Sequence, residues 1–208
     1  MRIRPLMVLC FGSVLSCFAD IYQEAIGPIA LDITTGSVYS ARIAITNRIE
    51  ALMRSVSNDC EVASCKLLKA SLLLDCAEED LSSAAYAEVT NLCSDVMSDF
   101  SSRNDKWQLY GSSFITMSAY ALDGKCHNAI VVATNALSKL DTVSSVDTET
   151  NVWNAITRES PFGAMSFRDT FRAGVALGKA VSHETTDIGV YTNGLPSEVV
   201  GIIDAMLR

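Results

Sequence analysis

Several patterns that usually identify an enzyme are missing from this chain of 208 residues. It contains no Gly-x-Ser-x-Gly nucleophile elbow, no glycine-rich phosphate loop and no Cys-x-x-Cys pair. Histidine is limited to His127 and His183, so histidine-based catalysis would have to use one of these positions. We therefore expect no catalytic residue, cofactor site or metal site. A pair of Asp or Glu residues leaves no local pattern, however, so a hydrolase-type enzyme using two carboxylates stays open.

The two histidines favour structural or solvent-exposed roles. His127 follows Cys126 directly, and neighbouring residues on a helix point about 100° apart, so we interpret this pair as structural. Residues 183–187 (His-Glu-Thr-Thr-Asp) superficially resemble a zinc-hydrolase motif with Asp187 in place of the second histidine. That motif needs a helix to place both ligands on one face, whereas Gly189 and nearby turn residues predict a loop.

Positive charge is also scarce. The formal net charge is −8, and loss of a leader that carries Arg2, Arg4 and no acids would make it −10. Phosphate groups favour clustered Lys and Arg, so we expect neither nucleic acid nor an anionic membrane as a partner. The acidic residues are scattered along the chain, which is typical of a solvated surface.

Residues 1–19 have the pattern of a secretory signal peptide. Arg2 and Arg4 form a basic start, residues 6–18 are mostly apolar, and Ala19 precedes the polar mature chain. This apolar stretch is shorter than the roughly 20 residues that span a bilayer. We predict export to the periplasm or the extracellular space. An uncleaved anchor is one alternative, and a lipid anchor at Cys17 is another, although Leu15 fits a lipobox poorly.

No later apolar run is long enough to cross a membrane, so we expect no transmembrane segment in the mature chain. Helical periodicity dominates instead, and the predicted fold is all-α, with about seven or eight helices in antiparallel hairpins. Residues 20–36 form an irregular lead-in, and residues 37–208 form a single helical domain. The first five predicted helices cover residues 38–56, 58–77, 81–100, 107–122 and 125–140.

Polar turns are expected at residues 78–80 and at Asp123-Gly124. The C-terminal part is less regular. It has a short predicted helix over residues 149–158 and a longer one over 167–182, opened by a capping-box pattern at Ser166 and Asp169. Residues 183–195 are predicted to form a loop, and Pro196 is predicted to occupy the first position of a closing helix.

One hairpin has a more specific pattern. Tyr120 precedes Gly124 by four residues, Ala129 follows by five, and Ala136 comes seven later. This spacing resembles a tetratricopeptide repeat over residues 113–141, and the resemblance implies an antiparallel helix pair. An ordinary helical bundle with one repeat-like hairpin remains open. The family's other positions differ, being occupied here by Ser113, Thr116, Met117, Ala133 and Asp141.

Five cysteines remain after the leader, and export would permit disulfides. Cys65 and Cys93 lie at nearly equal distances before and after the turn near residue 78, so they have similar heights on neighbouring antiparallel helices. Cys76 and Cys126 both lie beside turns at the same end. We predict Cys65–Cys93 first and Cys76–Cys126 second, with Cys60 left as a thiol. Buried cysteines acting as small apolar residues are the alternative.

Trp107, Tyr110 and Phe114 form an aromatic stripe at helical spacing. Such a stripe is usually core, and its alternative role is to line a groove for a partner. Together these features predict an exported helical module that binds a protein or associates with itself. The alternatives are the carboxylate enzyme and a lipid-anchored accessory protein.

Overall fold

The computed structural model describes residues 38–56, 59–80, 83–100, 106–141 and 165–208. Within these ranges every regular element is an α-helix and there is no strand, which confirms the all-α prediction. None of the helices in these ranges combines the length and apolarity that a bilayer crossing requires. The eight helices of the described ranges are α4 (Val38–Ser55), α5 (Asp59–Asp80), α6 (Ser83–Phe100), α7 (Lys106–Leu122), α8 (Cys126–Asp141), α10 (Phe167–Val181), α11 (Ile188–Thr192) and α12 (Ser197–Met206).

The described residues belong to two compact units, divided within α7 after Ile115. One contains α4, α5, α6 and the first part of α7. The other contains the rest of α7 from Thr116, together with α8, α10, α11 and α12. The expectation of a single domain over residues 37–208 stays a prediction. The signal peptide, Cys17, the lead-in and the predicted helix over 149–158 lie outside the described residues.

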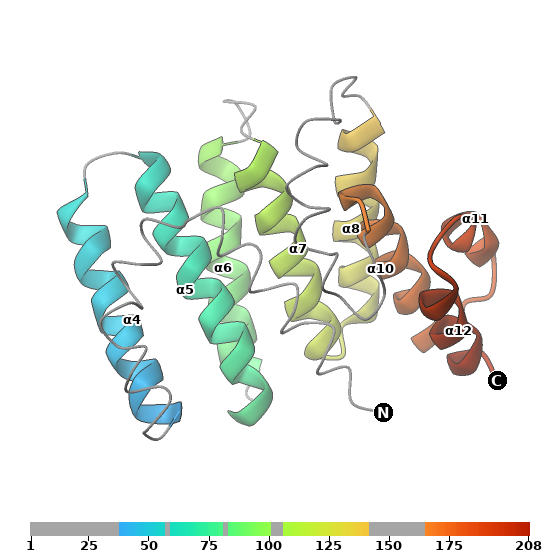
Figure 1. Ribbon diagram of the computed structural model, residues 1–208, viewed down its shortest axis with the longest axis horizontal. Coiled ribbons are helices and arrows are strands. Elements are labelled where there is room, and N and C mark those ends of the chain that lie inside the picture. Colours follow the sequence, from blue (N-terminus) through green and yellow to red (C-terminus); the bar gives the residue numbers. More distant parts are fainter. Residues whose placement is uncertain (1–37, 57–58, 81–82, 101–105, 142–164) are drawn as a thin grey trace. The chain divides into compact units, whose positions relative to one another are not determined.

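In the first unit, α5 packs against both α4 and α6, and the three helices lie side by side (Figure 1). Helix α5 is buried on more than one side, because Cys65, Leu67, Leu68 and Ala70 are all inaccessible to solvent. A helix enclosed in this way has apolar residues around its circumference instead of along one stripe. By contrast, α6 buries one narrow stripe, made of Tyr86, Val89, Cys93 and Val96.

In the second unit, α10 packs against α8 and also against α11 and α12. Two glycines permit the close approach on the α8 side. A Cβ added at Gly178 would lie 2.7 Å from Cγ1 of Ile130 in α8, and one at Gly174 would collide with Sδ of Met117 in α7. Gly174 and Gly178 therefore allow α10 to pack closely against its neighbours.

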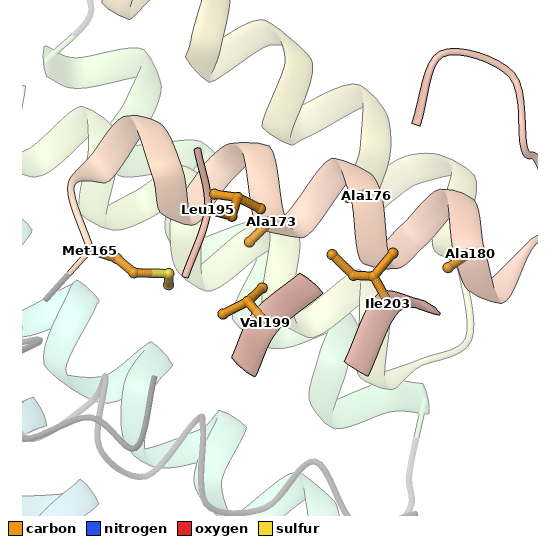
Figure 2. Close-up of a cluster of buried hydrophobic side chains, with 7 residues drawn as sticks. All are labelled: Met165, Ala173, Ala176, Ala180, Leu195, Val199 and Ile203. Atoms are coloured by element: carbon orange, nitrogen blue, oxygen red, sulfur yellow. The ribbon is translucent and has the colours of Figure 1, made fainter. Parts of the chain in front are cut away.

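The opposite side of α10 presents small side chains to larger ones from the C-terminal segment. Figure 2 shows Val199 and Ile203 of α12 lying against the side of α10 that carries Ala173, Ala176 and Ala180. Ile203 is fully buried, so α12 packs against this side of α10 mainly through Val199 and Ile203.

Helix α10 begins where the capping-box pattern predicted. The backbone N–H of Asp169 donates to Oγ of Ser166 at 3.0 Å, and the Ser166 hydroxyl donates to Oδ2 of Asp169 at 2.8 Å. These bonds satisfy one of the backbone donors that a helix N-terminus leaves open and place an acid in its first turn.

Helices α7 and α10 are each followed by a backbone turn of the same type. After α7, the N–H of Gly124 donates to the carbonyl of Ala121 and that of Lys125 to the carbonyl of Tyr120. This is the Schellman arrangement, with Gly124 in the left-handed conformation at φ 73°. After α10 the equivalent left-handed position is His183, at φ 55°.

Three predicted boundaries were wrong. Residues 78–80 belong to α5 and do not form a turn, because Glu-Glu-Asp contains neither Gly nor Pro to stop the helix. Pro196 is the N-cap of α12, and its first helical residue is Ser197. The predicted loop over 183–195 contains the short helix α11.

Candidate functional site

One charged group, Lys69 in the middle of α5, pairs with two carboxylates from two other helices. Its Nζ lies 2.9 Å from Oε1 of Glu50 in α4 and 3.1 Å from Oε1 of Glu88 in α6. The lysine side chain is 15% exposed, whereas both carboxylates are substantially exposed. One ammonium group therefore links three helices, while the side chains of Glu50 and Glu88 remain 40% and 50% exposed.

The protonation of this cluster suits an ion pair more than catalysis. Burial lowers the pKa of Lys69, but its hydrogen bonds to Glu50 and Glu88 outweigh burial and leave the pKa above its usual range. The hydrogen bond and charge of Lys69 lower the pKa of Glu50. An amine nucleophile needs a lowered pKa and a general-acid carboxylate needs a raised one, so both shifts run against those roles.

These shifts predict how stability depends on pH. The contribution of Glu50 is complete above the ordinary value of 4.5 and is lost as pH falls through its lower folded-state pKa. That of Lys69 is complete below the ordinary value of 10.5 and is lost as pH rises through its higher folded-state pKa. We expect Glu50→Gln to reduce the acid-induced fall in melting temperature between about pH 5 and pH 3.

Glu198→Gln is the matched control for this experiment, because Glu198 is exposed on α12 and its carboxylate accepts from the Ser197 hydroxyl. Thermal melts followed by circular dichroism at a series of pH values measure the effect. An acid response that is the same in Glu50→Gln as in the unmodified chain would contradict the assignment.

A second polar feature is a hydroxyl enclosed in the protein. Thr116 is 4% exposed. Its Oγ1 is buried and has no hydrogen-bond partner among the described residues. Leaving such a group unsatisfied costs about 1–3 kcal/mol. Ser112 and Ser118 are also buried in α7, so this apolar helix carries several polar groups into the interior.

Replacing this hydroxyl should stabilise the protein. We expect Thr116→Val to raise the free energy of unfolding by about 1 kcal/mol, because the methyl group keeps the shape and removes the unsatisfied oxygen. Thr170→Val is the matched control. Thr170 is equally buried, but its hydroxyl donates to the carbonyl of Ser166 at 2.9 Å, so its loss should cost about 1 kcal/mol. Urea unfolding measures both, and equal destabilisation would show that Thr116 also has a partner.

Two basic side chains of α10 hold the segment that contains α11. The guanidinium of Arg172 pairs with Asp169 at 3.3 Å and donates to the carbonyls of Val190 and Asn193. Lys179 donates to the carbonyl of Thr186 at 3.2 Å. Arg172 donates to carbonyls at the C-terminal end of α11, where a cation is favourable. Lys179 holds the residues just before α11, so the two side chains together fasten this segment to α10.

The segment from His183 to Asp187 forms turns and no helix, as predicted. His183 and Asp187 are exposed and both adopt left-handed turn conformations, so no helix face brings them together. His127 is exposed on α8, beside the half-buried Cys126. Among the residues that the structure describes, no group of three or more His, Cys, Asp or Glu side chains is placed to hold a metal ion.

The aromatic stripe is largely part of the core. Tyr110 is 4% exposed and Phe114 is 5% exposed, which favours the core interpretation over a groove lining. The side chain of Trp107 lies outside the described residues.

The cysteines are placed as follows. Cys65 and Cys93 are both fully buried, on the packed helices α5 and α6, and Cys126 is half-buried at the start of α8. None of these three forms a disulfide in the structure. The side chains of Cys60 and Cys76 lie outside the described residues, so the pairing Cys76–Cys126 stays a prediction.

Searches with this chain found no matching protein-family model, no matching curated protein and no matching solved structure.

Proposed function

We propose that this chain is an exported, non-catalytic helical module that binds another protein or associates with itself. The observation that supports the proposal most directly is the packing of the successive helices α4, α5 and α6 side by side; α10 likewise packs against α8. Such arrangements offer extended surfaces built from successive helices, which is how helical-repeat proteins contact their partners.

The resemblance to a tetratricopeptide hairpin adds to this proposal. Helices α7 and α8 are joined by a tight turn at Gly124, and Ala129 and Ala136 are buried on α8, the positions where the family has small residues for close helix crossing. At the family's aromatic second-helix position, Ala133 is also buried. We propose membership of the tetratricopeptide family together with the binding role that it implies.

Among the described residues, no observation favours either the carboxylate enzyme or the lipid-anchored accessory protein. A carboxylate that acts as a general acid requires a raised pKa, whereas the pKa of Glu50 is lowered by Lys69. The lipid-anchored alternative depends on Cys17, which lies outside the described residues.

The proposal is tested on the chain as the cell exports it. Chemical cross-linking of the exported fraction, followed by mass spectrometry, should recover peptides of this protein joined to one specific partner or to a second copy. Light scattering during size-exclusion chromatography of the purified protein separates these outcomes. A monomer at all concentrations, with no cross-link above the level of an unrelated exported helical protein, would overturn the binding role. Intact-mass analysis of the N-terminus tests the leader, because retention of Met1 would contradict export by this signal.

A further inference from the structure

Two ion pairs between α5 and α6 define which residues of these helices face each other. Nζ of Lys66 lies 3.5 Å from Oδ2 of Asp95, and Nζ of Lys69 lies 3.1 Å from Oε1 of Glu88. In antiparallel helices, one step back along the first corresponds to one step forward along the second. The two pairs therefore give independent estimates of the residue of α6 that lies at the height of Cys65.

Both estimates fall close to Cys93. From Lys66 and Asp95, one step back to Cys65 corresponds to one step forward, to Val96. From Lys69 and Glu88, four steps back correspond to four steps forward, to Leu92. Cys93 lies within this interval.

The other cysteine positions of α5 have no such counterpart. The same registers place Cys60 opposite residues 97–101 and Cys76 opposite residues 81–85, and neither range contains a cysteine. Cys65 is thus the cysteine of α5 that has another cysteine at its own height on α6.

Burial of both thiols is consistent with their lying between the two helices. Cys65 and Cys93 are fully inaccessible to solvent, and Cys93 lies on the buried stripe of α6 between Val89 and Val96. Packed helix axes lie about 8–10 Å apart and each Cα lies about 2.3 Å from its axis, so directly facing residues bring their Cα atoms to about 3.4–5.4 Å. Disulfides span Cα separations of about 4.4–6.8 Å.

We infer that Cys65 and Cys93 close to a buried disulfide between α5 and α6 when the chain folds in the presence of an oxidant. This assignment does not depend on the proposed binding role. The oxidant is a disulfide compound that reacts by thiol–disulfide exchange. One cysteine thiolate attacks its S–S bond and releases one thiol, and the other cysteine then attacks the mixed disulfide and releases the second. Two S–H bonds are lost and one S–S bond forms, while the two electrons and two protons leave on the released thiols.

Burial also sets when the reaction takes place. A disulfide reagent must approach the thiolate that attacks it, and in the packed helix pair both sulfurs are covered. The exchange therefore proceeds while α5 and α6 are still apart or transiently open. Once formed, the bond is shielded from reductants by the same packing.

The test uses the full mature chain, refolded in a buffer of reduced and oxidised glutathione and compared with chain kept in excess reductant. Acid quenching, unfolding, alkylation and peptide mapping should find the Cys65 and Cys93 peptides joined in the first sample and both alkylated in the second. The oxidised protein should melt about 10 °C higher. The bond should resist a reductant until denaturant is added.

Variants separate this pair from the other thiols. Cys93→Ala should abolish both the joined peptide and the melting shift between the two samples, whereas Cys126→Ala should keep both. Peptide mapping of the unmodified chain decides the matter even if Cys93→Ala fails to fold. Recovery of Cys65 and Cys93 as alkylated thiols after glutathione refolding, or of Cys65 joined to a different cysteine, would overturn the inference.

Discussion

Replacing Ile49 by alanine should lower the free energy of unfolding by about 2–5 kcal/mol. Ile49 is fully buried on α4, where that helix packs against α5, and truncation removes its apolar contacts and leaves a cavity. Such a loss is a large fraction of the 5–15 kcal/mol that typically stabilises a protein. Urea unfolding followed by circular dichroism measures it.

Ile43 provides the matched control, because it is the same residue type on the same helix but is 46% exposed. The gain in helix propensity on changing Ile to Ala is the same at both positions, so the difference between them isolates burial. Ile43→Ala should change stability by less than about 1 kcal/mol. Similar effects at the two positions would mean that α4 does not bury Ile49 as described.

The second large effect is expected at the contact between α10 and α8. The Cβ introduced by Gly178→Ala would lie 2.7 Å from Cγ1 of Ile130, a distance that requires one of the two helices to move. Overpacking of this kind costs about 1–3 kcal/mol, and alanine returns about 1 kcal/mol through its higher helix propensity. The net expectation is destabilisation by up to about 2 kcal/mol.

Two further variants distinguish steric conflict from a backbone effect. Gly201 is exposed on α12 with nothing within 4 Å of an added Cβ, so Gly201→Ala should stabilise by up to about 1 kcal/mol. Combining Gly178→Ala with Ile130→Ala should cost less than the sum of the two single changes, by about 1 kcal/mol or more. Strict additivity would rule out the contact as the cause.

Features set by neighbouring residues could be predicted from the sequence. Ser166 and Asp169 predicted the start of α10 because a capping box is satisfied within one helical turn. Gly124 predicted the turn after α7 because few other residues adopt its left-handed conformation readily. The extension of α5 to Asp80 was missed, because a run of acids signals neither a helix interior nor a stop with certainty.

Features that depend on the packing of distant segments could not be predicted from spacing alone. Tyr110 and Phe114 have the same helical spacing whether their stripe faces the core or a partner, so only the packing around α7 decides between the two. Lys69 follows Lys66-Leu67-Leu68 in the sequence, and this local pattern does not show that its side chain is largely buried. Identifying Glu50 and Glu88 as its partners still required the arrangement of three helices.

The enclosure of α7 has a consequence for how the protein opens. From Tyr110 to Ala119, every residue except Ser113 is buried, so no side of this stretch faces water. Amide protons exchange with solvent only when their hydrogen bonds break and water reaches them. In deuterated water the amides of this stretch should therefore be the last to exchange, whereas those of α11, which buries none of its residues, should be among the first.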